Sequence, residues 1–175
     1  ASAVPVFHMP QERSFSRECA LSAQGASSDL PMAGTPYTIE AWVMPAAGTG
    51  NGGIVGWGDY GRGNSVNALR FRDGPHRFRH YWWGNDLDVD LHSSLADGEY
   101  HHVAATWDGT TRRIFVDFVQ VTEAPSSGYG VTSKANFCVG KTYGDEYFSG
   151  KIRDLKIWKV ARTLQQMQAR SPTPQ

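Results

Sequence analysis

Residues 99–118, EYHHVAATWDGTTRRIFVDF, constrain the fold more than any other stretch of this chain. Side chains alternate in period two through residues 101–107 and again through residues 113–118, which is typical of half-buried β-strands. The intervening residues 108–111, Asp-Gly-Thr-Thr, favour a tight turn, because Gly109 accepts positive φ without a steric cost. The sequence therefore predicts an antiparallel β-hairpin here.

Composition favours one all-β domain. The chain has 175 residues, 19 of them glycine, and 12% are aromatic, while long helical patterns are missing from the sequence. Basic and acidic residues are equal in number, 17 each, which argues against a nucleic-acid or anionic-membrane partner. No apolar run approaches the length needed to cross a membrane. We expect a single domain over residues 1–170 and a linker-like tail over residues 171–175.

Further strands are predicted wherever short alternating runs lie between turn residues. A bulge or a change of face is expected between Ile152 and Leu155, because the apolar spacing slips by one residue there. Pro45 should end its strand, since proline cannot donate to a β-ladder. One or two helical turns are expected within residues 160–169. Outside the hairpin and outside residues 68–92, strands are predicted at residues 19–23, 37–43, 54–57, 135–140 and 147–158.

Residues 68–92 read as a three-stranded meander, with Gly84-Asn85 as a two-residue turn between its second and third strands. That turn fixes a register in which Trp83 opposes Asp86 and Tyr81 opposes Asp88. The same register pairs Arg79 with Asp90, Arg77 with His92, Trp82 with Leu87, His80 with Val89 and Phe78 with Leu91. One face is then apolar apart from His80, which we interpret as a satisfied core histidine. The other face carries arginines, acids and two aromatic rings.

Five segments in order resemble laminin G-like domains of the concanavalin A-like jelly-roll superfamily. They are YTIEAWV, GGIVGWGDYG, EYHHVAATWDGTTRRIFVD, NFCVGKT and YFSGKIRDLKIWKVART. The resemblance runs from about residue 19 to residue 163 and implies an all-β, antiparallel β-sandwich. The chain departs from the family at Asp117-Phe118, where an Asp-Gly pair is usual, so that turn must differ. Family members include carbohydrate-binding modules, protein-adhesion modules and accessory domains of glycosidases, so the fold alone does not fix function.

Three aspartates at a spacing of two, Asp86, Asp88 and Asp90, fall on one face of the predicted meander, with neighbours roughly 6.5–7 Å apart. Unpaired they would repel, so cross-strand compensation is the first explanation. The compensating residues are expected to be Arg77 and Arg79, together with either Arg70 or Arg72 from the first strand of the meander. Alternatively the acids accept hydrogen bonds from sugar hydroxyls. A flat strand converges poorly on a cation, and aspartates reach poorly across the ~5–5.5 Å that a retaining glycosidase pair needs.

Aromatic rings beside these charges suggest a sugar-binding surface. Tyr81 and Trp83 share the charged face, and an exposed ring supplies a flat apolar plate for the C–H face of a sugar. The alternative is that a loop or a partner covers this face. The polar loop after Trp57 is expected to contribute as well. The predicted ligand-binding residues are Trp57, Asp59, Tyr60, Arg62, Asn64, Tyr81, Trp83, Asn85, Asp86 and Asp88.

Cys19 and Cys138 are the two cysteines. Two buried thiols and a single disulfide both fit the sequence. The chain begins at Ala1 without methionine, which agrees with removal of a signal peptide and leads us to expect an extracellular protein.

Calcium is the cofactor that the sequence leaves open. A pentraxin-type site is disfavoured, because the matching loops offer only Asn51 at one place and Asp145 and Glu146 at the other. A calcium ion held elsewhere by backbone carbonyls is left as an alternative.

The function predicted from these residues and from the resemblance is a non-catalytic, secreted carbohydrate-binding module that recognises a glycan or glycoprotein. A protein-adhesion domain is the alternative from another class. A glycoside hydrolase of the β-glucanase type is the third hypothesis. The sequence determines neither the sugar nor the oligomeric state.

Overall fold

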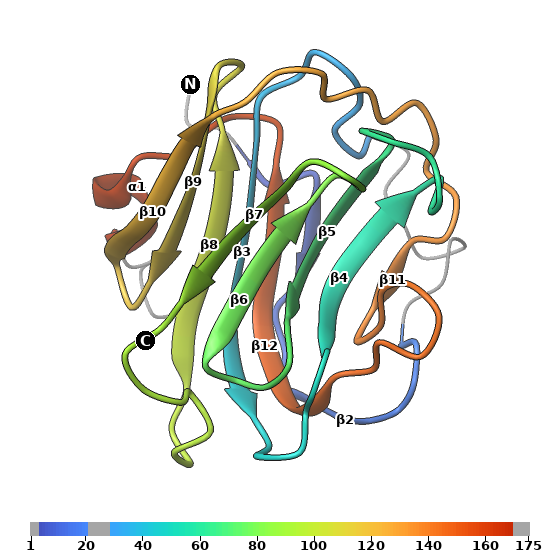
Figure 1. Cartoon of the computed structure of the whole chain (residues 1–175). Coiled ribbons are helices and arrows are strands. Elements are labelled where there is room, and N and C mark those ends of the chain that lie inside the picture. Colours follow the sequence, from blue (N-terminus) through green and yellow to red (C-terminus); the bar gives the residue numbers. More distant parts are fainter. Residues whose placement is uncertain (1–3, 21–28, 170–175) are drawn as a thin grey trace.

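A computed structural model describes residues 4–20 and 29–169 of the chain. It consists of two antiparallel β-sheets packed face to face, as Figure 1 shows. The larger sheet has seven strands in the order β1-β12-β3-β8-β9-β10, with β2 also paired to β12, and the smaller has five in the order β11-β4-β5-β6-β7. The predicted all-β antiparallel sandwich is confirmed.

Strand bounds follow the apolar runs of the sequence. The seven-stranded sheet contains β1 (Phe7–Met9), β2 (Arg13–Ser16), β3 (Tyr37–Pro45), β8 (His101–Trp107), β9 (Thr111–Val116), β10 (Val119–Pro125) and β12 (Ser149–Trp158). The five-stranded sheet contains β4 (Gly53–Gly58), β5 (Val66–Phe71), β6 (Arg77–Tyr81), β7 (Asp86–Asp90) and β11 (Cys138–Val139). A single short helix, α1 (Leu164–Gln168), follows β12 in the described part of the chain.

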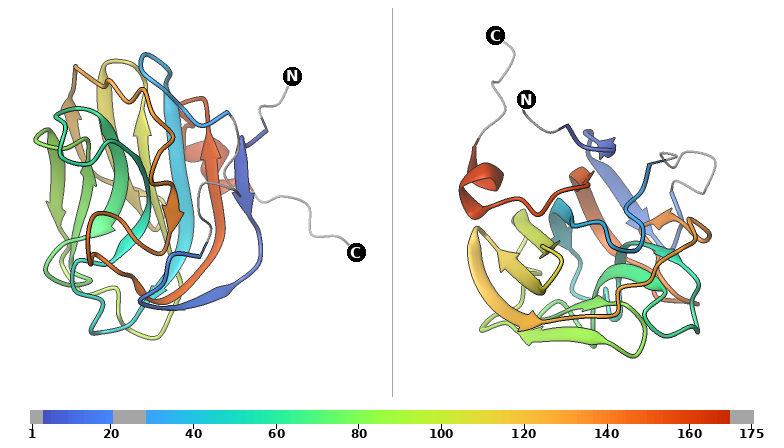
Figure 2. Two further views of the ribbon diagram at one scale, coloured as in Figure 1. Left: turned by 90° about the vertical axis from the view of Figure 1, so that its right-hand side faces the viewer. Right: turned by 90° about the horizontal axis from the view of Figure 1, so that it is seen from above.

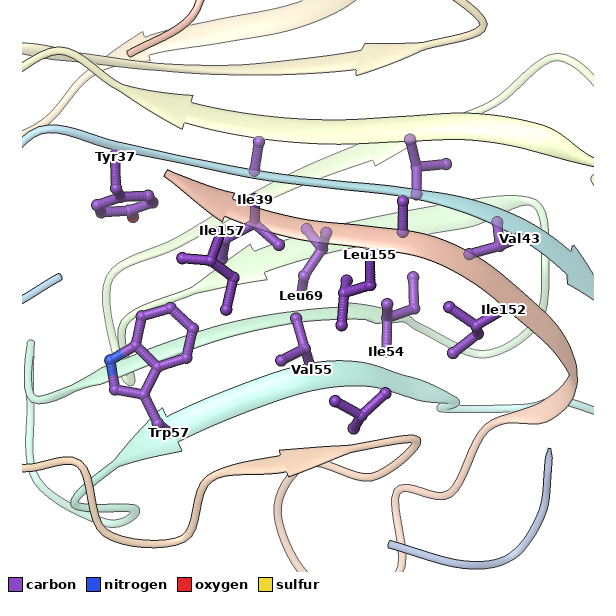
Figure 3. Close-up of a cluster of buried hydrophobic side chains, with 14 of the residues drawn as sticks. Tyr37, Ile39, Val43, Ile54, Val55, Trp57, Leu69, Ile152, Leu155 and Ile157 are labelled. Atoms are coloured by element: carbon purple, nitrogen blue, oxygen red, sulfur yellow. The ribbon is translucent and has the colours of Figure 1, made fainter. Parts of the chain in front are cut away.

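The core lies between the two sheets, where alternate side chains of each strand meet. Figure 3 shows Ile39 and Val43 of β3 and Leu155 of β12 facing Val55 and Leu69 of the smaller sheet. All five side chains are fully buried. This apolar layer is the main favourable term for folding, at about 25 cal/mol for each Å² removed from water.

The predicted hairpin is present as β8 and β9. Asp108 Oδ1 accepts hydrogen bonds from the backbone N–H groups of Thr110 and Thr111, at 2.9 and 2.8 Å, and so orders the turn. The next turn, between β9 and β10, is Asp117-Phe118, with φ of 48° and 63°. Two successive left-handed residues match the twist of a hairpin, so this chain makes with non-glycine residues the turn that usually requires glycine.

Helix α1 covers the part of the outer face of the large sheet formed by β8 and β9. Ala104 of β8 and Phe115 of β9 form a buried cluster with Met167 of the helix. Thr163 caps the helix by accepting a hydrogen bond from Gln166 N–H. Figure 2 shows the helix beside this sheet, away from the five-stranded one.

Several predicted strand ends are corrected. The bulge in β12 is confirmed by a register shift between Arg153 and Lys156. The expected strand over residues 135–140 shortens to β11, because Asn136 takes a left-handed φ of 60°. Residues 19 and 20 are not in a strand, and residues 21–23 lie outside the described residues, as does the tail over residues 171–175.

Cys19 and Cys138 form a disulfide with a Cα–Cα distance of 5.5 Å and a sequence separation of 119 residues. The bond ties the N-terminal segment to β11, and Ala20 N–H also donates to Val139 O at 2.9 Å. In the described residues, no helix has the length and apolar character to cross a membrane.

The predicted meander exists, but its register is wrong by two residues. Tyr81 pairs with Asp86 and Arg79 with Asp88, where the sequence analysis paired them with Asp88 and Asp90. The connection has four residues, 82–85, instead of two, because Trp82 is drawn into the core, where its Nε1 donates to Tyr37 Oη at 2.8 Å. A two-residue slip keeps every side chain on its predicted face, because the pleat has period two.

Candidate functional site on the outer face of the five-stranded sheet

One row of side chains crosses the outer face of the small sheet. Pairing places Cys138, Gly56, Ala68, Tyr81 and Asp86 side by side on five successive strands. Small residues in the middle of this row leave a hollow above the sheet. A Cβ built on Gly56 would lie 2.3 Å from the hydroxyl of Tyr60, so glycine is required for that hydroxyl to approach the strand this closely.

Four aromatic rings gather over this row. The Tyr60 ring centroid lies 6.4 Å from that of Tyr81, 6.2 Å from Trp83 and 5.7 Å from Tyr143. Trp83 and Tyr143 meet edge to face at 4.9 Å. Tyr143 is 50% exposed and Trp83 is half-buried, while Tyr81 is buried beneath them. The exposed pair therefore presents aromatic surface to solvent above a buried base.

A depression of about 230 Å³ lies beside this cluster. Its walls combine the aromatic rings with charged groups from β5, β6, β7 and the loop before β12. The lining residues are Arg70, Arg79, Tyr81, Trp83, Gly84, Asp86, Tyr143 and Glu146. Its size and its mixture of flat apolar and charged groups suit part of a polar, ring-shaped ligand.

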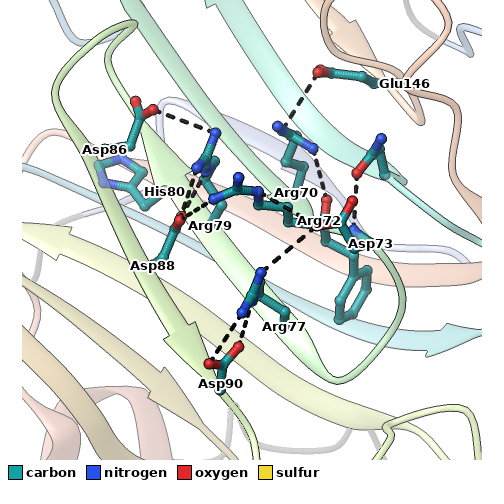
Figure 4. A network of polar contacts seen from close by, with 12 residues as sticks. Arg70, Arg72, Asp73, Arg77, Arg79, His80, Asp86, Asp88, Asp90 and Glu146 are labelled. Atoms are coloured by element: carbon teal, nitrogen blue, oxygen red, sulfur yellow. Dashed lines mark hydrogen bonds and ion pairs between the residues drawn. The ribbon is translucent and has the colours of Figure 1, made fainter.

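Arginines and acids form a network along the rest of the face, as Figure 4 shows. Arg79 donates from Nε and Nη2 to the two oxygens of Asp88, at 2.6 and 2.8 Å. Arg72 Nη1 donates to the same carboxylate at 2.7 Å. Arg77 makes a two-point contact with Asp90. The predicted cross-strand compensation is therefore observed, although the partners differ because of the register shift.

Glu146 connects the aromatic cluster to the network. Its Oε2 accepts hydrogen bonds from Tyr81 Oη at 3.1 Å, from Thr142 Oγ1 at 2.6 Å and from Tyr143 N–H at 3.0 Å. Its Oε1 lies 3.6 Å from Arg70 Nε. These contacts fix the loop that carries Tyr143 onto the sheet.

The two acids nearest the depression differ in their electrostatics. Burial raises the pKa of Asp86 against the opposing effect of Arg79. Hydrogen bonds from Arg79 lower the pKa of Asp88. The Asp86 carboxylate receives no hydrogen bond from the described part of the chain, and Arg79 Nη1 lies 3.4 Å from its Oδ2. Asp86 is therefore a partly desolvated acceptor that faces the depression.

Not every predicted site residue reaches the site. Trp57 is fully buried between the sheets with Nε1 donating to Pro31 O, so its assignment to a ligand site is wrong. Tyr81 was predicted to be exposed and is 4% exposed, because Tyr60 and Trp83 pack over it. Asp59 is half-buried.

Arg62, Asn64 and Asn85 lie on the loops around the depression and outside its lining. Arg62 is exposed on the loop before β5. Asn85 Nδ2 donates to Asn64 Oδ1 at 2.8 Å and to Ser127 O at 3.1 Å, so these two asparagines join neighbouring loops. Asn64 N–H also donates to Trp83 O at 3.1 Å, which links that loop to the turn bearing the exposed tryptophan.

Tyr143 and Glu146 are the site residues that the prediction missed. The available signal was the polar segment after Gly140, which the sequence analysis considered only as a calcium loop. Within residues 4–20 and 29–169, no group of three or more His, Cys, Asp or Glu side chains is arranged to hold a metal ion. A calcium site made by backbone carbonyls stays an untested prediction.

His80 occupies the predicted core position but is only partly satisfied, because its buried Nδ1 has no hydrogen-bond partner in the described part of the chain. His80 is fully buried, and its Nε2 lies 2.9 Å from both Tyr37 Oη and Asn67 Oδ1. Burial lowers the pKa of His80 well below its usual value, followed by the nearby charge of Arg112. This histidine is a neutral member of the core.

The two packed sheets define an antiparallel β-sandwich domain. A sequence profile of the concanavalin A-like lectin/glucanases superfamily matches residues 21–168, and the chain belongs to this family as a laminin G-like domain. Mouse pappalysin-1 is 25% identical over 155 residues that cover 78% of this chain and 10% of pappalysin-1. The chain thus spans about a tenth of the length of that relative.

Solved structures share the fold at low sequence identity. The CBM40 module of the Ruminococcus gnavus IT-sialidase, bound to α2,3-sialyllactose, superposes with a TM-score of 0.71 at 14% identity, covering 93% of this chain and 96% of that one. Leech intramolecular trans-sialidase superposes at 0.70 with 16% identity, covering 100% of this chain and 29% of that one. Such identities establish a common sandwich and carry no residue-level correspondence.

Proposed function

We propose that this chain is a non-catalytic, extracellular carbohydrate-binding module whose site is the depression beside Trp83 and Tyr143. The observation that carries the proposal is the edge-to-face pair formed by the exposed Tyr143 and the half-buried Trp83, next to the Asp86 carboxylate. A ring stacks on the apolar face of a sugar, while a carboxylate accepts hydrogen bonds from its hydroxyl groups. The partner is then a free glycan or the glycan of a glycoprotein.

Similar proteins support this assignment. The CBM40 module of the bacterial sialidase has a chain of matching extent, with 96% of it covered, and is bound to a sialylated lactose. The whole chain matches less than a third of the leech enzyme, 29% of its length. A domain of this fold therefore occurs both as a sugar-binding module and as part of a larger glycan-processing protein.

The carboxylates of β7 favour binding over catalysis. A general acid needs a raised pKa and freedom to donate its proton. Hydrogen bonds from Arg79 lower the pKa of Asp88, and those from Arg77 lower the pKa of Asp90. Asp86 is then the single β7 acid whose pKa is raised, and neither strand neighbour is free to serve as its partner in a glycosidase pair.

The extracellular assignment draws on the disulfide. A bond between Cys19 and Cys138 persists in oxidising compartments and is rare in the cytosol. Expression of the natural protein with fractionation of cells and medium tests this part, and recovery of both cysteines as free thiols from a reducing compartment would overturn it.

Trp83→Ala tests the sugar site directly. On a glycan array and then by calorimetry with the best ligand, we expect binding to weaken at least about tenfold, because an aromatic contact of this kind contributes roughly 1.4 kcal/mol or more. Phe118→Ala is the matched control, since Phe118 is also an aromatic residue at positive φ, 63° against 74°, in a different sheet's turn. It should leave binding unchanged.

The outcomes separate the alternatives. Equal loss in both variants would indicate damage to the fold and remove the evidence for this site. Undiminished binding by folded Trp83→Ala would refute the assignment of the depression. A protein that binds no glycan, yet binds a polypeptide after its sugars have been removed, would favour the protein-adhesion hypothesis.

A further inference from the structure

We infer, resting on the proposed function, that the sugar in this depression is electrically neutral: a hydroxyl-bearing pyranose, and not a sialic acid or another anionic sugar. An anionic sugar needs a cation that can leave its present partners and face the ligand. The structure supplies the opposite arrangement, because both arginines that line the depression are already committed to carboxylates or to the backbone.

Arg79 faces carboxylates from all three of its nitrogens. Nε and Nη2 donate to Asp88 at 2.6 and 2.8 Å, and Nη1 lies 3.4 Å from Asp86 Oδ2. A ligand carboxylate that took the two-point contact on Nε and Nη2 would have to displace Asp88, and one that approached Nη1 would lie beside Asp86. A displaced Asp88 would keep only Arg72 as its counter-charge, which is a cost that offsets the new contact.

Arg70 is committed and covered. Its Nη1 donates to Phe71 O at 3.2 Å, its Nε lies 3.6 Å from Glu146 Oε1, and its guanidinium lies 5.3 Å from the centroid of the Tyr81 ring. The residue is 7% exposed, and its Nε is buried without a hydrogen-bond partner. Because the group lies beneath the aromatic layer, it compensates Glu146 and offers a ligand little contact.

The remaining arginines of the face are also paired. Arg72 holds Asp88, and Arg77 holds Asp90 with Asp73 at 3.7 Å. Figure 4 shows these pairs in one network with Arg79 and Asp86. The described outer face of β5, β6 and β7 therefore has no uncompensated positive patch for an anion.

Asp86 makes the site complementary to hydroxyl groups. Its carboxylate faces the depression, and burial raises its pKa because water solvates it incompletely. Sugar hydroxyls supply the missing donors. A carboxylate or sulfate on a ligand in the depression would instead repel the Asp86 carboxylate. This repulsion would be stronger than in bulk water, because the partly buried surroundings screen charges less.

Two neighbouring cations lie outside the lining of the depression. Arg62 is exposed on the loop before β5, and Lys141 lies in an adjoining hollow that Tyr143 also lines. The Nζ of Lys141 lies 5.0 Å from the centroid of the Tyr147 ring. Because neither cation lines the depression itself, the lining around Asp86 gains no further positive charge from them.

The experiment compares matched pairs of glycans that differ only in a terminal sialic acid, such as lactose and its α2,3- and α2,6-sialylated forms, within an array of other neutral and anionic sugars. For every neutral ligand bound by the wild-type protein, we expect the sialylated or sulfated counterpart to bind at least about tenfold more weakly. Binding of the neutral ligand should change little between low and high salt, because no net charge is paired.

Asp86→Asn supplies the decisive variant. This variant should bind the neutral ligand about fivefold to tenfold more weakly, because a charged hydrogen-bond acceptor is lost. It should also reduce the difference in affinity between the neutral glycan and its anionic counterpart. Asp90→Asn is the matched control on the same strand, outside the depression and paired with Arg77. It should leave affinity and preference unchanged.

Two results overturn the inference in distinguishable ways. Equal or tighter binding of the sialylated member, weakening with salt, would refute a neutral ligand while leaving carbohydrate binding intact; loss of that binding in Lys141→Ala would place the anion in the adjoining hollow. Binding of no sugar at all would remove the proposed function itself. A preference for neutral sugars that Asp86→Asn narrows and Asp90→Asn does not would support the inference.

Discussion

Replacing Arg112 with methionine tests how the two sheets cooperate in holding the candidate site. Arg112 belongs to β9 of the large sheet and is 2% exposed, with its guanidinium 3.9 Å from the centroid of the Trp82 ring. It donates to Ser126 Oγ at 2.9 Å, to His80 O at 3.4 Å and to Asn85 Oδ1 at 3.1 Å. Trp82 and Asn85 are the two ends of the turn that carries Trp83.

The expected loss of stability follows from these contacts. Three hydrogen bonds from a charged donor, at about 1.5 kcal/mol each, and a buried cation–π contact of about 2 kcal/mol set a gross loss of about 6.5 kcal/mol. Methionine no longer has to bury a charge, and burial lowers the pKa of Arg112, which reports that cost. If relief of desolvation offsets about half of the gross loss, the net loss is about 3 kcal/mol.

The assays are urea unfolding and calorimetric titration with the best ligand from the glycan array. Arg112→Met should lose about 3 kcal/mol and bind the glycan about fivefold more weakly, because Asn85 no longer anchors the turn. Arg112→Lys should recover part of both losses, since it keeps the charge without the planar fork. Arg113→Met, which removes exposed ion pairs with Asp108 and Glu123, is the control and should cost about 0.5 kcal/mol.

A loss of less than about 1 kcal/mol in Arg112→Met would contradict the claim that these hydrogen bonds are needed. A full loss of stability with unchanged sugar affinity in the folded fraction would separate the arginine from the site. Either result would mean that the turn bearing Trp83 is held by its own strand pairing alone.

Two further predictions concern other parts of the molecule. Cys19→Ser together with Cys138→Ser should lower the free energy of unfolding by about 3 kcal/mol, because the disulfide restricts a long loop of the unfolded chain; a change under ~1 kcal/mol in urea would contradict this. Burial opposes charging of His101, but its hydrogen bonds to Asp117 and Asp97 raise its pKa above 6.5. That stabilisation is therefore complete below pH 6.5 and lost as pH rises through the folded-state pKa. The wild-type free energy of unfolding should therefore fall between pH 6.5 and the folded-state pKa of His101, and this fall should be smaller in His101→Gln. The same dependence on pH in both proteins would refute this prediction.

The fold was predictable because its evidence is local. Alternation in β3 and in the β8–β9 hairpin placed Ile39, Val103 and Ile114 on the buried side, where the structure finds them fully buried. A strand with one apolar face has essentially one way to lie on a core. The sequence left open whether the two cysteines are free thiols or form a disulfide, because it does not show how close they lie in space.

The register of the meander was not predictable from local signals. Gly84-Asn85 is good turn chemistry, yet the connection is two residues longer because Trp82 bonds to Tyr37 and stacks on Arg112 in the core. Those partners come from strands far away in the sequence. Tertiary packing overrode a valid local preference.

The site shows the same division. Periodicity alone put Trp83 and Asp86 on an outward face, and both line the depression. Tyr143 and Glu146 reach it from a loop some sixty residues further along, a placement that depends on β11 lying next to β4. The position of a loop depends on how its flanking strands are ordered in the sheet, and local sequence patterns do not show that order.

The sequence by itself thus determined which side chains of a strand share a face, because side chains alternate between the two faces with a period of two residues. Only the tertiary structure decided which outward-facing groups meet and which arginine neutralises which acid. It also decided that the Asp86 carboxylate receives no hydrogen bond from the described part of the chain and can accept one from a ligand. Those pairings depend on strand order and loop packing, and their energies come from distances between residues that are remote in the chain.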